Sequence, residues 1–345
     1  MSTFGRLAVL GGAAGFALAA WGARGWRNHS FRGQTVLITG GSRGLGLVMA
    51  RELAREGAQL AIVARDEGEL ERAARELTGL GTEVLAFACD VRNPSECEAA
   101  VARVIGHFGR IDVLINNAGT IQTGPVDHMQ VADFENAMAT HFWGPLHLTK
   151  AAAPHMQRQG SGRIVNISSI GGLVATPHLA PYCASKFALV GLSDSLRAEL
   201  SRHNILVTTV CPGLLRTGAH YNCLFKGHHR AEFTWFAVLD SLPFTSISAE
   251  RTARQIIEAS RRGRPHLTVT TQARFLVAFD ALAPNLNAQL LKLVDRLLPP
   301  PTGTDGDIAR TGWDSRSPLA PSILTRLNDR ATVQNNELRG HEPVI

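Results

Sequence analysis

Residues 34–57 read QTVLITGGSRGLGLVMARELAREG, and this stretch decides the fold. An apolar strand pattern runs into a glycine turn at Gly40, Gly44 and Gly46, and an amphipathic helix pattern follows at once. Glycines permit a tight turn and a close approach of backbone to pyrophosphate, while the helix N-terminus offers N–H groups and partial positive charge. The stretch therefore predicts a phosphate-binding loop; the alternative is a glycine-rich turn without a ligand.

Further apolar runs at LAIV, VLAFA, IDVLI, RIVNI and ILVTTV alternate with helical patterns. This alternation predicts an α/β fold, a Rossmann-like doubly wound parallel sheet. With 345 residues, 45% of them hydrophobic, the chain can bury one large core, so we expect a single domain with extensions. The expected parts are a hydrophobic N-terminal segment over 1–29, the Rossmann-fold domain over 30–270, a helical extension over 271–298 and a mostly disordered tail over 299–345.

Tyr182 and Lys186 lie four residues apart in PYCASKFALVGLSDSL, and Ser169 stands thirteen residues before Tyr182. If Pro181 starts a helix, Tyr182 and Lys186 share one face about one turn apart. A tyrosine with a pKa of about 10 needs a nearby cation before it exchanges protons with an alcohol or ketone at neutral pH. Lys186 supplies that charge, and Ser169 offers a hydroxyl to the substrate oxygen. The spacing alone is also typical of a solvated helix face.

Together, these motifs resemble those of the short-chain dehydrogenase/reductase family. The resemblance covers about residues 34–266 and implies a nicotinamide cofactor and reversible carbonyl reduction. It is carried by T-G-x-x-x-G-x-G at 39–46, N-N-A-G at 116–119, Ser169, Tyr182-x-x-x-Lys186 and P-G at 212–213.

One position departs from the family. The family usually has an asparagine three residues before a helical glycine, whereas THFWGP has His141 ahead of Gly144. In the family, this asparagine supports a water-mediated proton relay through the lysine. Histidine can also donate and accept hydrogen bonds, so we expect His141 to join the catalytic set. The alternative is that His141 only packs within its helix.

Two arginines indicate which cofactor is used. Arg43 lies inside the glycine loop, and Arg65 ends the strand pattern LAIVAR, where an acidic residue would bind the ribose 2′-OH of NAD. Guanidinium groups bind a 2′-phosphate through several donors, and an acid there would repel it. Asp66 follows directly, but its side chain should point away. We therefore expect NADP(H), with two ordinary surface arginines as the alternative.

The resemblance extends the cofactor site to other strand ends. It places Asp90 and Val91 around the adenine, and lets Leu215 and Thr217 approach the nicotinamide carboxamide. A plain strand end at Asp90 and a simple helix cap at Thr217 are the alternatives. The residues expected at the cofactor are Gly40, Ser42, Arg43, Gly44, Leu45, Gly46, Arg65, Asp90, Val91, Asn117, Ala118, Gly119, Tyr182, Lys186, Pro212, Gly213, Leu215 and Thr217.

The N-terminus carries an uncharged stretch, Leu7–Trp21, with Arg6 before it and three arginines after it. Fifteen residues are short for a membrane span, and a signal peptide is an alternative. We favour an uncleaved anchor, because export would remove an NADP(H) enzyme from its reductant. The positive-inside rule then places the catalytic domain on the cytoplasmic side of the membrane.

Charge and cysteine usage bound the partners. The formal net charge is +6, but no nucleic-acid motif accompanies it, so we expect no nucleic-acid partner. Five cysteines form no CxxC pattern, and we expect neither a metal site nor a disulfide framework. The sequence leaves open whether the protein forms a homo-oligomer.

Substrate choice should reside after Thr217. Residues 221–244, YNCLFKGHHRAEFTWFAVLDSLPF, are rich in aromatic and basic residues, as a mobile helical lid over a lipophilic substrate would be. The alternative is a segment that leans on a membrane surface. We expect an NADP(H)-dependent oxidoreductase that interconverts a secondary alcohol and a ketone or aldehyde, with Tyr182 as proton donor and acceptor. The alternative is a non-catalytic NADP(H)-binding regulatory or scaffold protein.

Overall fold

The computed structural model of the chain describes residues 29–338. Nearly all of the expected N-terminal anchor, 1–29, lies outside this range, as do residues 339–345. Among the helices of the described part, none combines the length and apolar character needed to cross a membrane.

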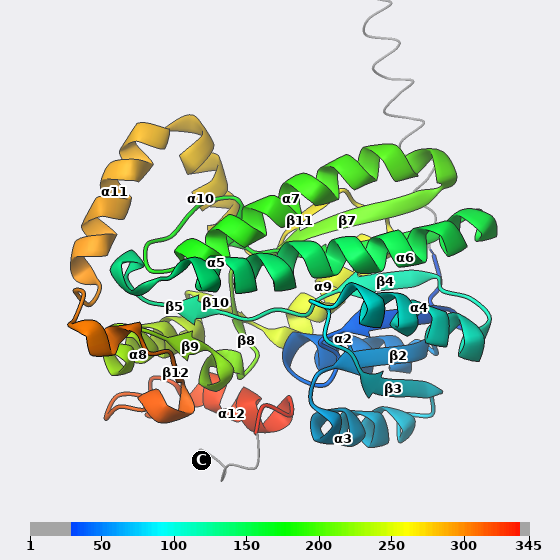
Figure 1. The fold of residues 1–345 in the computed structure, drawn as a ribbon, viewed down its shortest axis with the longest axis horizontal. Helices are drawn as coiled ribbons and strands as arrows, with labels where there is room; N and C mark the ends of the chain where they lie inside the picture. The colour runs from blue at the N-terminus through cyan, green and yellow to red at the C-terminus, as the bar shows by residue number, and fades with distance from the viewer. Residues whose placement is uncertain (1–28, 339–345) are drawn as a thin grey trace, which may run out of the picture.

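Seven strands form one parallel central sheet, in the order β11-β7-β6-β4-β1-β2-β3 (Figure 1). Every neighbouring pair is parallel, as the alternating sequence pattern predicts. The strand order reverses between β1 and β4, and open α/β sheets bind ligands at the carboxyl ends of strands beside such a point. The strands are β1 (Thr35–Thr39), β2 (Gln59–Ala64), β3 (Val84–Ala88), β4 (Val113–Asn116), β6 (Gly162–Ile167), β7 (Ile205–Cys211) and β11 (His266–Thr268).

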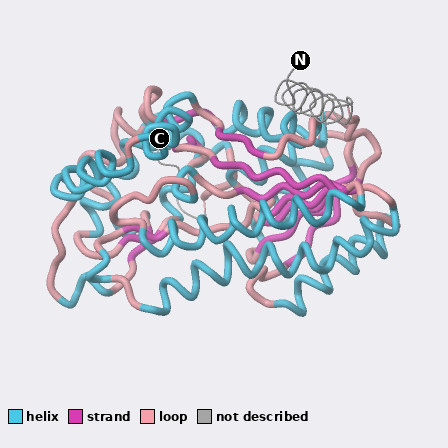
Figure 2. The backbone as a smooth tube through the Cα atoms, turned by 90° about the horizontal axis from the view of Figure 1, so that it is seen from above, coloured by secondary structure: helices cyan, strands magenta, loops and turns pink. Residues whose placement is uncertain are grey.

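Alternate residues of β1 face opposite sides of the sheet. Val36 and Ile38 belong to a buried cluster that also holds the apolar faces of α2, α3 and α9, whereas Leu37 packs with α4 and α6. Figure 2 shows the strands as one layer between helices. The flanking helices are α2 (Gly44–Arg55), α3 (Glu67–Thr78), α9 (Ala249–Arg261), α4 (Pro94–Phe108), α5 (Val131–Met138), α6 (Gly144–Gln159) and α7 (Ala180–Leu200).

A single π-helical turn, η2 (Ala139–Trp143), joins α5 to α6 and contains His141. Such bulges insert a residue into a helix and are frequent at functional sites. Before residue 299, the 3-10 turns and short strands are η1 (Val126–His128), η3 (Ile170–Gly172), η4 (Ser201–His203), η5 (Ala219–Asn222), β5 (Gln122–Thr123), β8 (Leu214–Arg216), β9 (Leu224–Phe225) and β10 (Ser246–Ser248).

The expected lid is a packed element. Its helix, α8 (His229–Ser241), contributes Phe233 and Phe236 to an aromatic cluster that also contains Tyr221 and Phe225. The aromatic residues that suggested a surface for substrate are therefore largely core residues of a lobe beside the main sheet, and the structure gives no support to a loosely attached lid.

The expectation of a mostly disordered tail over 299–345 is wrong for its described part. Residues up to 338 form η6 (Thr304–Asp307), β12 (Arg310–Thr311), η7 (Trp313–Ser315) and α12 (Arg326–Gln334). Trp313 stacks on Tyr221 with ring centroids 4.4 Å apart, and β12 pairs with β9. The tail is polar in composition, but polar residues such as Asn328 are buried and hydrogen-bonded instead of solvated.

Two further helices form the expected C-terminal extension. Helices α10 (Thr271–Leu282) and α11 (Pro284–Leu297) meet at an apex and diverge from it as an arch beside the body of the molecule (Figure 1). Several of its apolar side chains are exposed, among them Phe275, Leu282, Leu286, Leu293 and Leu297.

Candidate active site

Ser169, Tyr182 and Lys186, three of the four predicted catalytic residues, come together. Helix α7 begins at Ala180 with Pro181 in its first turn, so Tyr182 and Lys186 lie one turn apart on one face. The Lys186 Nζ atom is 5.6 Å from the centroid of the Tyr182 ring. Ser169 follows β6, caps η3 by accepting the Gly171 N–H at 3.1 Å, and hydrogen-bonds with Tyr182.

Burial sets the protonation of this group. It lowers the pKa of Lys186 to about 8, and the Lys186 ammonium donates to the Ile167 carbonyl at 2.9 Å. Burial also raises the pKa of the Tyr182 phenol, while the hydrogen bond with Ser169 acts in the opposite direction. At neutral pH the phenol therefore carries its proton, which is the state that a proton donor needs.

His141 is held by both ring nitrogens. Its Nε2 accepts the Thr120 N–H at 3.1 Å, so Nδ1 carries the proton and donates to Ser185 Oγ, 2.7 Å away. The Ser185 hydroxyl then donates to the Tyr182 carbonyl at 2.8 Å. The His141 and Tyr182 rings also meet edge to face, with centroids 5.5 Å apart.

The geometry makes His141 a positioning residue for Tyr182. Burial, aided by the Lys186 charge, keeps the His141 pKa well below its usual range, so the imidazole is neutral near pH 7. Because Nε2 is bonded to Thr120 and Nδ1 to Ser185, the imidazole links the segment after β4 to the first turns of α7. A relay through the His141 side chain stays a prediction, since it would have to break one of these contacts.

The glycine loop fits a dinucleotide phosphate. Gly40 and Gly44 have φ values of 62° and 55°, in the left-handed region that favours glycine. A Cβ on Gly46 would collide with the Gly40 carbonyl. The Asn117 amide donates to the Thr39 and Gly40 carbonyls at 3.0 and 3.2 Å, which ties the end of β4 to the loop.

The other Asn117 contacts complete this arrangement. The Thr39 hydroxyl accepts the N–H groups of Asn117 and Ala118, at 2.9 and 3.0 Å. The Asn117 side chain and N–H thus pair with groups of Thr39 and Gly40 at the end of the central strand. Asn116 instead donates to the Asn166 side chain, and Gly119 lies against His141.

The two predicted phosphate-binding arginines lie in different surroundings. Arg65 is exposed at the end of β2. The pKa of Asp90 is lowered mainly by the hydrogen bond from Arg92, and the Arg65 charge adds to this effect. Arg43 is paired with Glu69 at 3.1 Å. Asp66 caps α3 by accepting the Glu69 N–H at 2.8 Å.

Glu69 is a residue that sequence reasoning missed. It is buried, and it accepts from the Ser42 hydroxyl at 3.0 Å as well as from Arg43. In the sequence, Glu69 looks like any other acidic residue on the exposed face of a helix. Its role depends on the way α3 packs beside the loop, which has no local signature.

The remaining predicted residues lie where β7 ends. The Pro212 carbonyl accepts the Ile170 N–H at 2.7 Å, and the Leu215 N–H donates to Asp240 at 3.1 Å. Thr217 Oγ1 accepts the Ala219 N–H at 3.3 Å at the start of η5. Gly218 is the N-cap residue of η5, and Thr217 borders the glycine loop, so its contact with the cofactor stays a prediction.

A second group missed by the sequence comes from the C-terminus. The Gly44 N–H donates to the Asn335 carbonyl at 2.9 Å, and Glu337 lies 3.4 Å from the Arg43 Nε atom. These contacts join positions about 290 residues apart in the chain, as the 294-residue separation of Ser42 and Asn336 illustrates. Nothing in the sequence of either segment indicates the other.

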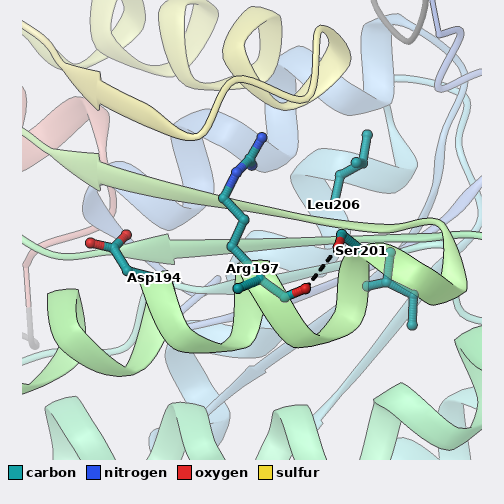
Figure 3. Close-up of a pocket in the computed structure, with 6 residues that line it drawn as sticks. Asp194, Arg197, Ser201 and Leu206 are labelled. Atoms are coloured by element: carbon teal, nitrogen blue, oxygen red, sulfur yellow. Dashed lines mark hydrogen bonds between the residues drawn. The ribbon is translucent and has the colours of Figure 1, made fainter. Parts of the chain in front are cut away.

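Two hollows lie away from the catalytic group. One, of about 340 Å³, lies along the C-terminal half of α7, where the Ser201 hydroxyl donates to Ala198 (Figure 3). The other lies between α7 and α11 and includes Cys183, Phe187 and Leu291. Neither hollow has Ser169, Tyr182 or Lys186 among the residues that line it.

Known proteins share this arrangement. The short chain dehydrogenase family matches residues 34–223. The 11-beta-hydroxysteroid dehydrogenase-like 2 protein of Arabidopsis thaliana is 34% identical over 264 residues, which cover 76% of this chain and 82% of that protein. The ketoacyl reductase HetN of Nostoc is 38% identical over 181 residues, 52% of this chain and 63% of the relative.

Solved structures agree on the fold. The L-sorbose reductase of Gluconobacter frateurii, solved with NADPH and L-sorbose, superposes with a TM-score of 0.63 at 26% identity, covering 70% of this chain and 97% of that one. The family match spans the glycine loop and the Ser169, Tyr182 and Lys186 group that the structure brings together. The chain belongs to the short-chain dehydrogenase family.

Proposed function

We propose that the protein is an NADP(H)-dependent oxidoreductase that interconverts a ketone or aldehyde and an alcohol on a lipophilic substrate. The observation that carries the proposal is the grouping of Ser169, Tyr182 and Lys186 at the carboxyl edge of the sheet that also bears the glycine loop. A non-catalytic nucleotide-binding protein would have no need to keep a neutral phenol beside a buried ammonium.

The residues divide the work in carbonyl reduction. A bound nicotinamide would supply the hydride to the carbonyl carbon. Ser169 holds the carbonyl oxygen by a hydrogen bond, and the Tyr182 hydroxyl donates its proton to that oxygen as negative charge develops. The Lys186 ammonium stabilises the resulting phenolate, and the His141 and Ser185 contacts fix the helix that carries Tyr182. Oxidation of the alcohol reverses these proton movements.

The preference for NADP(H) is supported by charge. Arg43 stands in the loop and Arg65 is exposed at the end of β2, where a 2′-phosphate would lie. The L-sorbose reductase named above was solved with NADPH. Gly40, Ser42, Gly44, Leu45 and Gly46 would form the loop that holds the phosphates.

The proposal includes a lipophilic substrate and membrane association. The Arabidopsis relative carries a hydroxysteroid dehydrogenase name, and the arch of α10 and α11 exposes apolar side chains. The uncharged stretch 7–21 would anchor the chain with its catalytic domain on the cytoplasmic side. Membrane fractionation of the full chain beside a chain lacking residues 1–29 tests this. Equal recovery of both chains in the soluble fraction would contradict the anchor.

The activity test uses the full-length protein, a panel of lipophilic ketones and aldehydes, and NADPH, followed by the absorbance of the reduced nicotinamide. We expect turnover that falls by about 10²- to 10⁴-fold in Tyr182→Phe, because only the transferable proton is lost. Ser169→Ala should also lose turnover. If NADPH binds but no substrate turns over, or if Tyr182→Phe matches the wild type, the proposed mechanism is wrong.

A further inference from the structure

The last described residues, Asn335–Leu338, lie over the glycine loop, and we call them the closing segment. Helix α12 brings them there, and Figure 1 shows this helix near α2 and α3 although it lies at the other end of the chain. The Asn335 carbonyl accepts the Gly44 N–H at 2.9 Å, and its side-chain amide donates to the Thr217 carbonyl at 3.2 Å. Asn335 has no exposed surface.

Glu337 places a negative charge where a phosphate would bind. Its Oε1 atom lies 2.7 Å from the position that a Cβ on Gly44 would take, with Thr217 close to the same point. Its Oε2 atom is 3.4 Å from Arg43 Nε and accepts from Asn222 at 2.6 Å. A buried carboxylate at the N-terminus of α2 is thus held by the positive end of the helix and an arginine, as a phosphate would be.

Asn336 fastens the segment from outside the phosphate position. Its side-chain amide donates to the Ser42 and Glu69 backbone carbonyls at 2.8 and 3.0 Å, and its Oδ1 atom accepts from Arg72 at 2.7 Å. Its φ of 58° lies in the left-handed region, which asparagine tolerates better than most residues. Arg51 adds a hydrogen bond to the Asn335 side chain at 2.9 Å.

We propose that Asn335–Leu338 is a built-in competitor of the dinucleotide, which occupies the phosphate-binding surface of the glycine loop and must leave before the cofactor binds. The inference rests on the proposed function, because it assumes that the loop binds NADP(H). The closing segment uses the Gly44 N–H and the Arg43 guanidinium, and its carboxylate would repel a pyrophosphate at the same place. Access of the cofactor is therefore regulated by the chain's own C-terminus.

Release of the segment is a local event. Its attachments include hydrogen bonds, the contact of Glu337 with Arg43 and the packing of Leu338 against the aromatic cluster. Helix α12 before it is held independently by Asn328 and Asp329. If the closed form predominates, the apparent affinity for the dinucleotide is reduced by the fraction of molecules that are open. A closed population of about 90% would weaken apparent binding about tenfold.

Two shortened chains separate the closing segment from the rest of the tail. Residues 1–334 lack the segment, whereas residues 1–338 keep it and lack only the residues after it. Calorimetric titration with NADPH should give a dissociation constant about tenfold lower or more for 1–334 than for the full chain. The 1–338 chain is the matched control and should bind like the full chain. Circular dichroism and the melting temperature report whether both chains are folded.

A second measurement uses the full chain. Addition of NADPH should speed hydrogen exchange at the amides of residues 335–338 and slow it at residues 40–46, because the cofactor replaces the segment. Asn336→Ala removes the fastening without touching Arg43, Gly44 or Glu337, and should tighten NADPH binding severalfold. This variant decides the question if the 1–334 chain fails to fold.

The outcomes separate the two proposals. If 1–334, 1–338 and Asn336→Ala bind NADPH equally, or if NADPH slows exchange at residues 335–338, the competitor role is overturned while cofactor binding stands. If none of the folded chains binds NADPH or NADH, the proposed function itself fails. Tighter binding by 1–334 and Asn336→Ala, with faster exchange of the segment on NADPH addition, supports the inference.

Discussion

His141 Nδ1 lies 2.7 Å from Ser185 Oγ, and this contact links the π-helical turn to the helix that carries Tyr182. The Ser185 hydroxyl passes the connection on to the Tyr182 carbonyl. The imidazole thus occupies the position where the family usually has an asparagine. In its neutral form it links Thr120 to Ser185 of α7 by two hydrogen bonds.

His141→Asn should lower kcat by about tenfold without changing the pH dependence of the reaction between about pH 6 and 9. An asparagine is too short to reach both Thr120 and Ser185, so Tyr182 is held less firmly, and rates fall when a catalytic group is misplaced. The pH dependence should stay the same because the His141 pKa lies well below 6.5. Steady-state rates across this range test both points. An ionisation near neutrality that disappears in His141→Asn would show that the imidazole titrates during turnover.

The wild-type protein should bind NADPH at least about tenfold more tightly than NADH. Charge-assisted pairing to a phosphate is worth about 1.5–3 kcal/mol, which is enough for that ratio. Arg65→Ala and Arg43→Ala should each reduce the ratio, and Arg202→Ala, an exposed arginine in η4, is the matched control. Titrating each protein with both nucleotides gives the ratio directly, and the closing segment affects both nucleotides alike. Equal affinities in the wild type would end the NADP(H) assignment.

Local sequence signals predicted the parts of the site that are built from neighbouring residues. The strand, turn and helix of 34–57 form one unit, and Tyr182 and Lys186 share a helix face because their spacing requires it. The reversal of strand order places these units at the same sheet edge. None of this needed knowledge of distant contacts.

The parts that were not predicted depend on contacts between distant segments. Asp329 lies in a polar tail whose composition is typical of disorder, yet it accepts from the Tyr221 hydroxyl at 2.9 Å within the packed lobe. Likewise, Glu69 and Glu337 meet Arg43 only because α3 and the C-terminus pack beside the loop. A single polar residue carries no mark of such a partner.

Lys186 should make stability depend on pH. Its pKa of about 8 in the folded protein is below the ordinary lysine value of 10.5, so the unfolded chain binds more protons between these values. Folding stability from this residue is therefore present above pH 10.5 and is lost as pH falls through about 8. The shift corresponds to about 3 kcal/mol. Urea unfolding of wild type and Lys186→Met at pH 7 to 10.5 isolates the effect, because other titrating groups are common to both proteins.

The quantity that tests this prediction is the difference in free energy of unfolding between wild type and Lys186→Met. Lys186→Met should gain stability relative to wild type as pH falls from 10.5 to about 8, whatever the constant cost of losing the hydrogen bond to Ile167. A difference that stays constant over that range would mean that Lys186 keeps an ordinary pKa in the folded protein.

Trp313→Ala should lower the free energy of unfolding by about 3–5 kcal/mol, the range for removing a buried aromatic side chain. Trp313 is only 8% exposed and stacks on Tyr221, so its loss leaves a cavity between the tail and the aromatic cluster. Ile323→Ala, at an 83% exposed position of the same tail, is the matched control and should change stability by less than about 0.5 kcal/mol. Urea unfolding followed by far-ultraviolet circular dichroism measures both.

Because Trp313 fastens the segment that leads to α12, Trp313→Ala should also loosen the closing segment and speed hydrogen exchange at residues 335–338. If both substitutions are equally mild, the tail does not pack on the lobe in solution, and the expectation of disorder there would be restored.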